Sequence, residues 1–388
     1  MKIDFSEDNE FLSDWYAQEV PDCVLLCEYP SSNSQETVLQ NRDRYIIHDP
    51  FPPPDPSLLK TLGPHHLMFG WGGSIPVASQ VPPGEDLVSH WENLFLSGAK
   101  PDWREFDVTD AMSKYVVLFP HESIAANQQL VDPGTNYHLH SKEVIPCIDC
   151  PQPAVLNEAS IPSVVKLSHG YAGLGNYFVH SQSDLQRMNQ EVDQNWNNAT
   201  LVATEIIRDV VGDYGVQFFL TKSGGVKWLG YTEQHFDSSR RWCGGQYESE
   251  KQIDMAGLFS PFIRATSNYL HSKGYFGVVG IDILKNAQGE MFLVDVNPRL
   301  TGITPFVLGA RFLGRENRAR EGLYAASCEF YGSPAELFEA VDQLDEVIIA
   351  VLSYFEKKAQ GITLCHLGAY SNSPELNVEA IESLTSPR

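Results

Sequence analysis

The sequence is poor in basic residues. It contains 27 lysines and arginines against 50 aspartates and glutamates, which gives a formal net charge of −23. Nucleic acids and anionic membranes both bind proteins through an excess of lysine and arginine. We therefore expect neither as a partner, although a small anionic ligand held by a few local cations is compatible with this charge.

Long apolar runs are also missing. No window approaches the roughly 18 consecutive apolar residues that a membrane-spanning helix needs. The opening residues, MKIDFSEDNEFLSDW, lack the apolar stretch of a signal peptide. The seven cysteines are sparse and odd in number, so we expect reduced thiols and a cytoplasmic protein.

The N-terminal part, residues 1–135, has the residue pattern of a small α/β domain. Its apolar runs CVLLCEY and YVVLFP predict buried strands. No glycine-rich phosphate fingerprint follows either run, so a Rossmann site for NAD has no support. We expect the proline-rich stretches Asp49–Ser57 and Val81–Asp86 to be irregular, because each proline removes a backbone donor.

The rest of the chain alternates strands with helices. The stretch SVVKLSHGYAGLGNYFVH predicts a strand, a glycine loop and a second strand. Two β-rich runs contain the turns KSGG and NAQGE and so predict hairpins. With a chain of 388 residues, we expect more than one domain. Further elements are expected as helices over 183–196, 254–273 and 333–344, strands over 346–355 and 361–368, and a short final helix.

Two carboxylates meet across the second hairpin. Asp282 lies before the turn NAQGE, and Asp295 and Asn297 lie after it on one face of the returning strand. Oxygen ligands of this kind suit Mg²⁺, and a cation would relieve the repulsion between the acids. The alternative is an exposed sheet end with solvated acids. Arg299 follows and offers a planar fork of donors suited to phosphate or carboxylate.

A lysine and a glycine loop precede this hairpin. Lys166 lies on a strand that leads into the loop from His169 to Asn176. The glycines Gly170, Gly173 and Gly175 let backbone N–H groups approach a phosphate closely. The spacing matches neither the Walker A motif nor the dinucleotide fingerprint, so an ordinary glycine-rich hairpin is the alternative.

Taken in this order, these elements resemble the ATP-grasp superfamily over residues 136–305. The resemblance implies an ATP-grasp fold, with α+β subdomains over 136–203 and 204–305 that grip ATP. It further implies a preceding domain of the pre-ATP-grasp kind over 1–135. Residues 306–388 would complete the large subdomain or extend it.

The resemblance also assigns roles. Lys142 and Lys166 match the lysines that contact the phosphates, and His169, Gly170, Gly173 and Gly175 match the loop that covers them. In the linker between the subdomains, TEIIRD, Glu205 and Ile207 match the residues that hold adenine. Asp213 is the candidate for the carboxylate that binds the ribose, and Asp209 is the alternative. Asp282, Asp295 and Asn297 match the Mg²⁺ ligands, and Arg299 matches the arginine at the transferred group.

Most members of this superfamily pass the γ-phosphoryl group of ATP to a carboxylate and then let an amine attack the acylphosphate. The resemblance therefore implies a carboxylate–amine ligase that uses ATP and two Mg²⁺ ions, or Mn²⁺ in their place. Its substrates would be a small-molecule carboxylate and amine, and a homodimer is the assembly it suggests. Two alternatives stay open: a phosphotransferase or carboxylate–thiol ligase of the same fold, and a nucleotide-binding regulatory protein without turnover.

The second substrate has its own candidates. Arg240 and Arg241 lie beside glycines where family members bind the acyl substrate, and a solvated loop is the alternative. Thr301 and Thr304 follow Arg299 and are expected to line the same cavity. A zinc site is the weakest candidate; it would use His138, His140, Cys147 and Cys150.

Overall fold

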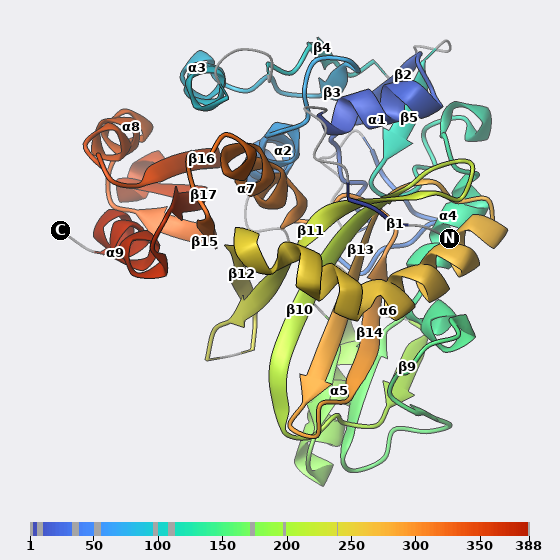
Figure 1. Ribbon diagram of the computed structural model, residues 1–388. Coiled ribbons are helices and arrows are strands. Elements are labelled where there is room, and N and C mark those ends of the chain that lie inside the picture. Colours follow the sequence, from blue (N-terminus) through green and yellow to red (C-terminus); the bar gives the residue numbers. More distant parts are fainter. Residues whose placement is uncertain are drawn as a thin grey trace.

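The computed structural model describes most of the chain in three sheets (Figure 1). The described residues are 3–5, 11–32, 39–49, 56–95, 100–107, 113–170, 175–196, 199–238 and 240–386, without the side chains of Pro56 and Leu59. None of the helices among them is long and apolar enough to cross a membrane. The candidate site is built from residues in or beside these three sheets.

The first sheet lies in the N-terminal part and is parallel. Its order is β4-β3-β2-β5, with strands β2 (Cys23–Leu26), β3 (Val77–Ser79), β4 (Trp103–Glu105) and β5 (Lys114–Val117). The side chains of β2 and β3 are all buried and, except for Ser79, apolar, as expected for a parallel sheet covered on both faces. The helices beside it are α1 (Leu12–Glu19), α2 (Pro56–Met68) and α3 (Glu85–Leu94).

The expectation that both proline-rich stretches are irregular was wrong at their ends. Helix α2 begins at Pro56 and α3 begins at Glu85, directly after the N-cap Gly84. Proline is tolerated in the first turn of a helix, where its missing N–H would have no partner anyway. The segment 50–55 lies outside the described residues.

The second sheet is small and antiparallel. Its order is β6-β9-β7-β8, with β6 (Val155–Leu156), β7 (Ser163–Leu167), β8 (Asn176–Val179) and β9 (Leu201–Thr204). Helix α5 (Gln182–Asn195) follows β8 and is capped by the Ser181 hydroxyl. Helix α4 (Pro133–His140) and a 3₁₀ helix (Lys142–Cys147) lead into this sheet.

The third sheet has nine strands in the order β14-β13-β10-β11-β12-β15-β17-β16, with β1 paired to β11. The strands of residues 204–305 are β10 (Val210–Leu220), β11 (Val226–Phe236), β12 (Trp242–Glu248), β13 (Gly277–Asn286) and β14 (Met291–Asn297). The others are β1 (Ile3–Asp4), β15 (Glu321–Phe330), β16 (Ile348–Lys357) and β17 (Ile362–Ser371). Both predicted hairpins are present, as β10–β11 and β13–β14.

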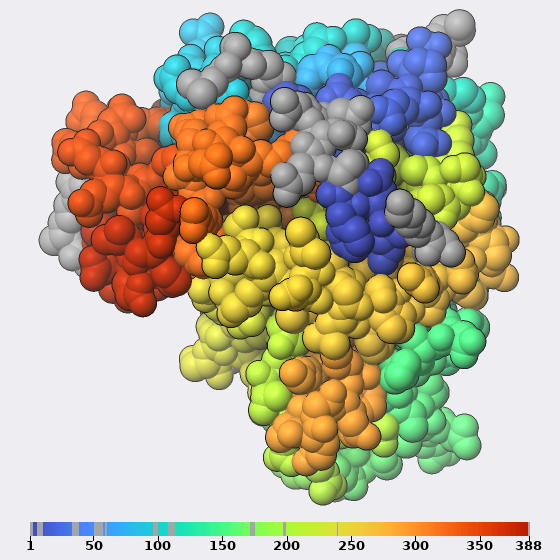
Figure 2. Space-filling view, in the orientation of Figure 1, coloured from blue at the N-terminus to red at the C-terminus, as the bar shows by residue number. Residues whose placement is uncertain are grey.

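Helices cover this sheet. Helix α6 (Gln252–Ser272) lies across the face of β10, β11 and β13 and is the yellow surface at the front of Figure 2. Near the C-terminal strands lie α7 (Thr304–Arg315), α8 (Pro334–Asp342) and α9 (Pro374–Thr385). The sheet runs without a break past residue 305, so the C-terminal part extends the same layer.

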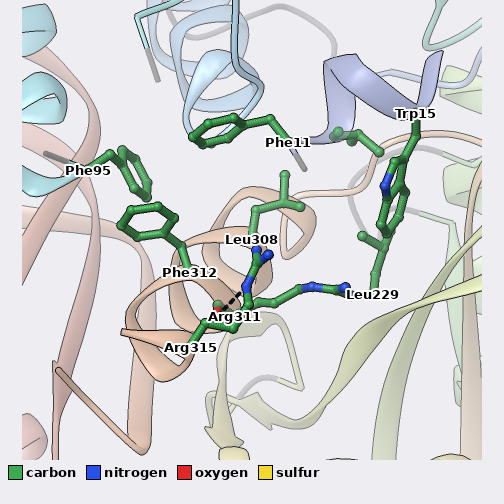
Figure 3. Close-up of a pocket in the computed structure, with 10 residues that line it drawn as sticks. Phe11, Trp15, Phe95, Leu229, Leu308, Arg311, Phe312 and Arg315 are labelled. Carbon is green, nitrogen blue, oxygen red and sulfur yellow. Dashed lines mark hydrogen bonds between the residues drawn. The ribbon is translucent and has the colours of Figure 1, made fainter. Parts of the chain in front are cut away.

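The N-terminal part packs firmly on the C-terminal strands. The Trp91 indole donates to the Val351 carbonyl at 2.8 Å, and His90 Nε2 accepts from the Val351 N–H at 3.0 Å. One buried apolar cluster joins Trp71 and Trp91 to Phe306 and Leu352. Helices α1 and α7 meet around a narrow crevice lined by Trp15, Arg311 and their neighbours (Figure 3). This shared buried core holds the N-terminal part against the C-terminal strands.

Candidate active site

The β13–β14 hairpin brings the two predicted acids together. Asp282 lies directly opposite Asp295, and Gly280 lies opposite Asn297. The register shifts after Asp282, so a bulge follows the acidic pair; bulges of this kind often re-aim side chains beside active sites. Asp282, Asp295 and Asn297 therefore gather at one end of the hairpin.

The two acids differ in their protonation. Burial raises the pKa of Asp282, and the neighbouring Asp295 carboxylate raises it further. Burial also opposes ionisation of Asp295, but Lys142 and Lys166 outweigh it and lower the pKa of that carboxyl below its usual range. The result is one firmly ionised carboxylate beside one whose ionisation is disfavoured by burial and by its neighbour.

Both predicted lysines reach this hairpin from the small subdomain. Lys142 Nζ lies 2.5 Å from Asp295 Oδ1, and Lys166 Nζ donates to the Val294 carbonyl at 2.7 Å. Burial lowers the pKa of Lys166, while Asp295, Asp282 and Asp213 act against that change. The structure thus places two cations and two carboxylates in one group drawn from both subdomains.

Sequence reasoning missed Gln234, which belongs to the same group. Its side-chain amide donates to Asp282 Oδ1 at 2.8 Å from strand β11. Strand β10 lies between β11 and β13, and its Gly215 is the partner of Asp282. A Cβ on Gly215 would lie 3.2 Å from Gln234 Nε2, so the glycine leaves room for the glutamine to reach across. No motif signals this contact, because it spans three strands.

Arg299 is braced beside the acids. It donates to the Leu300 carbonyl at 2.9 Å and to Asn297 Oδ1 at 3.3 Å. Its guanidinium lies over the Phe119 ring, 4.8 Å from the centroid. Its Nε is buried and has no hydrogen-bond partner among the residues that the structure describes. The N-terminal part therefore supplies the surface on which this arginine rests.

Thr301 takes part in a buried hydrogen-bond network. Its hydroxyl donates to Gln217 Oε1 at 3.2 Å, and the Thr304 hydroxyl donates to the same oxygen at 2.9 Å. A Cβ on Gly280 would lie 2.8 Å from both Gln217 Nε2 and Thr301 Cγ2. This network fixes the turn after Arg299, so the hydroxyl of Thr301 is already engaged in holding the backbone.

The linker between the subdomains borders a cavity of about 440 Å³. Glu205 and Ile207 line it together with Phe292 and residues of the β13–β14 turn. The Glu205 carboxylate accepts from the Ala154 N–H at 3.1 Å, which braces the linker against β6. Apolar and polar side chains both line the cavity, and the apolar surfaces of Ile207 and Phe292 suit a planar ring such as adenine.

The two candidates for the ribose differ in their surroundings. Burial raises the pKa of Asp213 to about 7, with a further rise from Asp282 and a fall from Lys166. Asp213 therefore stands beside the acidic pair and the second lysine. Asp209 is exposed in the linker, with φ of 51°, and its carbonyl accepts from Ala287 N–H at 2.8 Å.

The glycine loop begins from a fixed base. The His169 ring stacks on Tyr137 at 3.9 Å, and its Nε2–H donates to the Tyr137 carbonyl at 3.0 Å. The His169 carbonyl accepts from the His48 N–H, and Gly170 bridges to His48. Gly175 has φ of +78°, and a Cβ there would clash with Leu167. Gly173 and its neighbours, residues 171–174, lie outside the described residues.

The structure separates the two arginines proposed for the acyl substrate. Arg240 lies over the Phe178 ring of β8, 4.5 Å from the centroid, so it joins the large sheet to the small one. Arg241 Nη2 lies 2.8 Å from Asp237 Oδ2, and the arginine side chain is 81% exposed. Arg241 is therefore engaged in a surface ion pair, whereas Arg240 faces the strand that follows the glycine loop.

The donor set fits a hard cation such as Mg²⁺. Asp282 and Asp295 offer carboxylate oxygens and Asn297 offers an amide oxygen, the ligand types that Mg²⁺ takes beside water and phosphate. The structure does not support the candidate zinc site. Among the described residues, no group of three or more histidine, cysteine or acidic side chains has the geometry to hold a metal. His140 is buried and Cys147 is exposed.

Known proteins share parts of the sequence pattern and the fold of this chain. Residues 149–297 match the family model for an ATP-grasp L-aspartate–L-methionine ligase. No curated protein sequence matches the chain significantly. Similar solved structures include N5-carboxyaminoimidazole ribonucleotide synthetase (purK) with ADP, at 14% identity, 80% of this chain, 89% of that chain and a TM-score of 0.53.

Two further solved structures are N5-carboxyaminoimidazole synthetases. The one from Staphylococcus aureus, complexed with ADP, has 11% identity, covers 81% of this chain and 91% of that one, and has a TM-score of 0.53. The one from Thermus thermophilus has 9% identity, covers 81% of this chain and 92% of that one, and has a TM-score of 0.51. At such identities the likeness shows a common fold.

Proposed function

We propose that this chain, an ATP-grasp protein whose family match supports an ATP-dependent carboxylate–amine ligase, joins two amino acids through an acylphosphate. The observation that carries this proposal is the group formed by Lys142, Lys166, Asp282 and Asp295. It places cations from one subdomain against carboxylates from the other. Arg299 stands two residues beyond Asn297 at the same strand end.

Different residues of the site would bind different parts of ATP. Adenine would occupy the linker cavity beside Glu205 and Ile207, and Asp213 would meet the ribose. Lys142 and Lys166 would contact the phosphates, with the backbone of the glycine loop above them. Asp282, Asp295 and Asn297 would hold Mg²⁺, as two ions or with Mn²⁺ in their place. The metal supplies neutralisation of phosphate charge at that position.

The first step forms the acylphosphate. A carboxylate oxygen of the substrate attacks the γ-phosphorus of ATP, the bond to the β–γ bridging oxygen breaks, and ADP leaves with that electron pair. Arg299 would hold the transferred phosphoryl group and the two lysines would balance its charge, because such a transfer needs positioning and neutralisation more than a covalent protein group.

The second step forms the amide. The uncharged amine attacks the acyl carbon, the carbon–oxygen bond to phosphate breaks, and inorganic phosphate leaves. The proton lost by nitrogen passes to phosphate or water. The family model names a ligase of two amino acids, and on that basis we propose an amino-acid carboxylate and an amino-acid amine as the substrates.

A substrate panel tests the proposal. The purified protein is incubated with ATP, Mg²⁺ and pairs of L-amino acids, with ADP release and product mass as the readouts. We expect ADP release to require both the amino acid that supplies the carboxylate and the amino acid that supplies the amine. ADP from the acid alone with a stable phosphorylated product would indicate a phosphotransferase, and a requirement for a thiol would indicate a thiol ligase. ATP binding without turnover would indicate a regulatory protein.

The organisation around the site is also part of the proposal. We propose that residues 136–203 and 204–305 act as the two gripping subdomains, behind an N-terminal domain over 1–135. The homodimer implied by the resemblance is a further expectation, which sedimentation velocity of the purified protein would test.

A further inference from the structure

A cluster of aromatic and imidazole side chains lies beyond Arg299 and is not used by the chemistry above. It consists of His66 on α2, Trp242 on β12, Tyr324 on β15 and His366 on β17. The Tyr324 and His366 rings are stacked with centroids 6.0 Å apart, and the Trp242 and Tyr324 rings lie 5.6 Å apart. The His66 and His366 rings lie 4.6 Å apart. Segments from distant parts of the chain thus meet at one place.

The hydrogen bonds in the cluster fix the proton on His366. The Ser327 N–H points at His366 Nδ1 at 3.3 Å, and the Tyr324 hydroxyl lies 2.8 Å from the same atom. A backbone N–H can only donate, so Nδ1 is the acceptor and the proton of the neutral ring lies on Nε2. Burial keeps the pKa of Tyr324 well above its usual value, so its hydroxyl also donates.

The backbone is shaped to make these bonds. Ser327 has φ of 54°, a left-handed conformation that is uncommon for a serine. It lies in an irregularity between Ala325 and Cys328, where the register of β15 against β17 shifts. Local strain and bulges of this kind concentrate at functional sites. Here the strained residue turns its N–H toward His366.

The cluster adjoins the segment that carries Arg299. His66 Nε2–H donates to the Gly302 carbonyl at 2.6 Å, and a Cβ on Gly302 would lie 3.3 Å from the Trp242 ring. His66 Nδ1, the other nitrogen of the imidazole, is buried and has no hydrogen-bond partner within the described part of the chain. On the N-terminal side, Tyr29 lies 6.3 Å from Phe119, the ring under Arg299. The cluster therefore borders the turn that follows Arg299.

Two members are accessible and two are not. Trp242 and His366 are partly exposed, whereas Tyr324 and His66 are 1% and 3% exposed. Burial lowers the pKa of His66 to about 4 and that of His366 well below its usual value. The exposed face is therefore an aromatic surface with one imidazole N–H and no charge. Such a surface favours an apolar group, since a charged one would lose hydration without a partner.

We infer that Trp242 and His366 form the subsite for the amine substrate, an L-amino acid with an uncharged side chain. This inference rests on the proposed ligase function. Trp242 packs against the side chain of that amino acid, and His366 Nε2–H donates to an oxygen of it. Tyr324 and His66 are positioning residues: Tyr324 holds the tautomer of His366, and His66 ties the subsite to Gly302.

The test separates the subsite from carboxylate activation by changing the nucleophile. Hydroxylamine traps an acylphosphate as a hydroxamate and is too small to need a side-chain subsite. The variants are His366→Phe, which keeps a ring to stack on Tyr324 but removes the donor, and Trp242→Leu. The matched control is Tyr370→Phe, which removes a buried tyrosine hydroxyl from the same sheet, bound to the Phe306 carbonyl at 3.1 Å.

We expect the KM for the amino-acid amine to rise about tenfold or more in both variants, as for the loss of a hydrogen bond or a packed ring. The rate of hydroxamate formation should stay within about twofold. Tyr370→Phe should change neither. An equal fall of hydroxamate and dipeptide formation, or an unchanged KM for the amine, would overturn the subsite.

Failure of the ligase function gives a different pattern. In that case the unmodified protein makes no hydroxamate from any L-amino acid. The subsite is then tested by thermal unfolding with ADP, Mg²⁺ and each uncharged L-amino acid. Stabilisation of the unmodified protein that is lost in His366→Phe supports the subsite. Equal stabilisation of both proteins, or stabilisation of neither, overturns it.

Discussion

Lys142 and Asp295 form an ion pair of 2.5 Å across 153 positions of sequence. The lysine enters from the segment before the small sheet, where its backbone N–H also bonds to the Ser168 carbonyl at the end of β7. The aspartate belongs to the hairpin of the large sheet. Each charge is partly buried and needs the other, so the pair holds the segment before the small sheet against the hairpin of the large sheet.

Asp295→Asn should abolish turnover and preserve the fold. The change is nearly isosteric but removes the charge that the metal and Lys142 require, so we expect a loss of about 100-fold or more in kcat. ADP release over a range of Mg²⁺ concentrations measures the effect, and circular dichroism checks the fold. The control is Asp237→Asn, which removes a carboxylate paired with Arg241 on the surface. Full activity in Asp295→Asn would refute the metal assignment.

Lys166→Met should weaken ATP binding more than it slows catalysis. The side chain keeps its length and loses its charge, and we expect the Kd for ATP to rise about tenfold, the effect of roughly one hydrogen bond to a charged group. Isothermal calorimetry with a non-hydrolysable ATP analogue gives the value. Lys357→Met, at a surface lysine 3.6 Å from Glu329, serves as the control. An unaltered affinity in Lys166→Met would remove this lysine from the site.

Gln234→Leu should raise the Mg²⁺ concentration needed for activity. The glutamine orients Asp282 through a 2.8 Å hydrogen bond, and loss of such an outer partner costs about 10- to 100-fold in metal affinity. Thermal stabilisation by ADP titrated with Mg²⁺ gives a readout independent of turnover. Gln246→Leu on the neighbouring strand β12 is the matched control. If both variants need the same Mg²⁺ concentration as the unmodified protein, Gln234 does not position Asp282.

Glu28 should make stability fall as the pH rises. Burial raises the pKa of Glu28 to about 7 against an ordinary value of 4.5, although the Gln80 backbone and side chain donate to it. The folded state therefore favours the protonated acid. That advantage is complete below pH 4.5 and is lost as the pH rises through 7. Relative to Glu28→Gln, the free energy of unfolding should drop by about 3 kcal/mol over this window.

Urea unfolding of both proteins at several pH values between about 4 and about 8 measures this difference. The comparison cancels the other titrating groups and any constant cost of the new amide. A difference that stays flat across the window, or that grows in favour of the unmodified protein, would contradict the raised pKa of Glu28.

The sequence was informative where contacts are local. Asp282 and Asp295 are joined by one hairpin, and its turn and alternation fix which side chains share a face. Gln234 and the His66–His366 cluster gave no such signal. They depend on pairing among strands that are far apart in sequence, and on glycines such as Gly215 that matter only for the room they leave. Arg240 and Arg241 were equivalent candidates in the sequence, but in the structure Arg240 contacts Phe178 and Arg241 pairs with Asp237.

The sequence by itself determined the acidic hairpin and the lysine ahead of the glycine loop, because local periodicity and turn signals carry those properties. Only the tertiary structure decided that Lys142 pairs with Asp295, that Gln234 supports Asp282, and that His66 and Trp242 contact the segment after Arg299. These contacts follow from strand order and from burial summed over the whole molecule, which no short stretch of sequence contains.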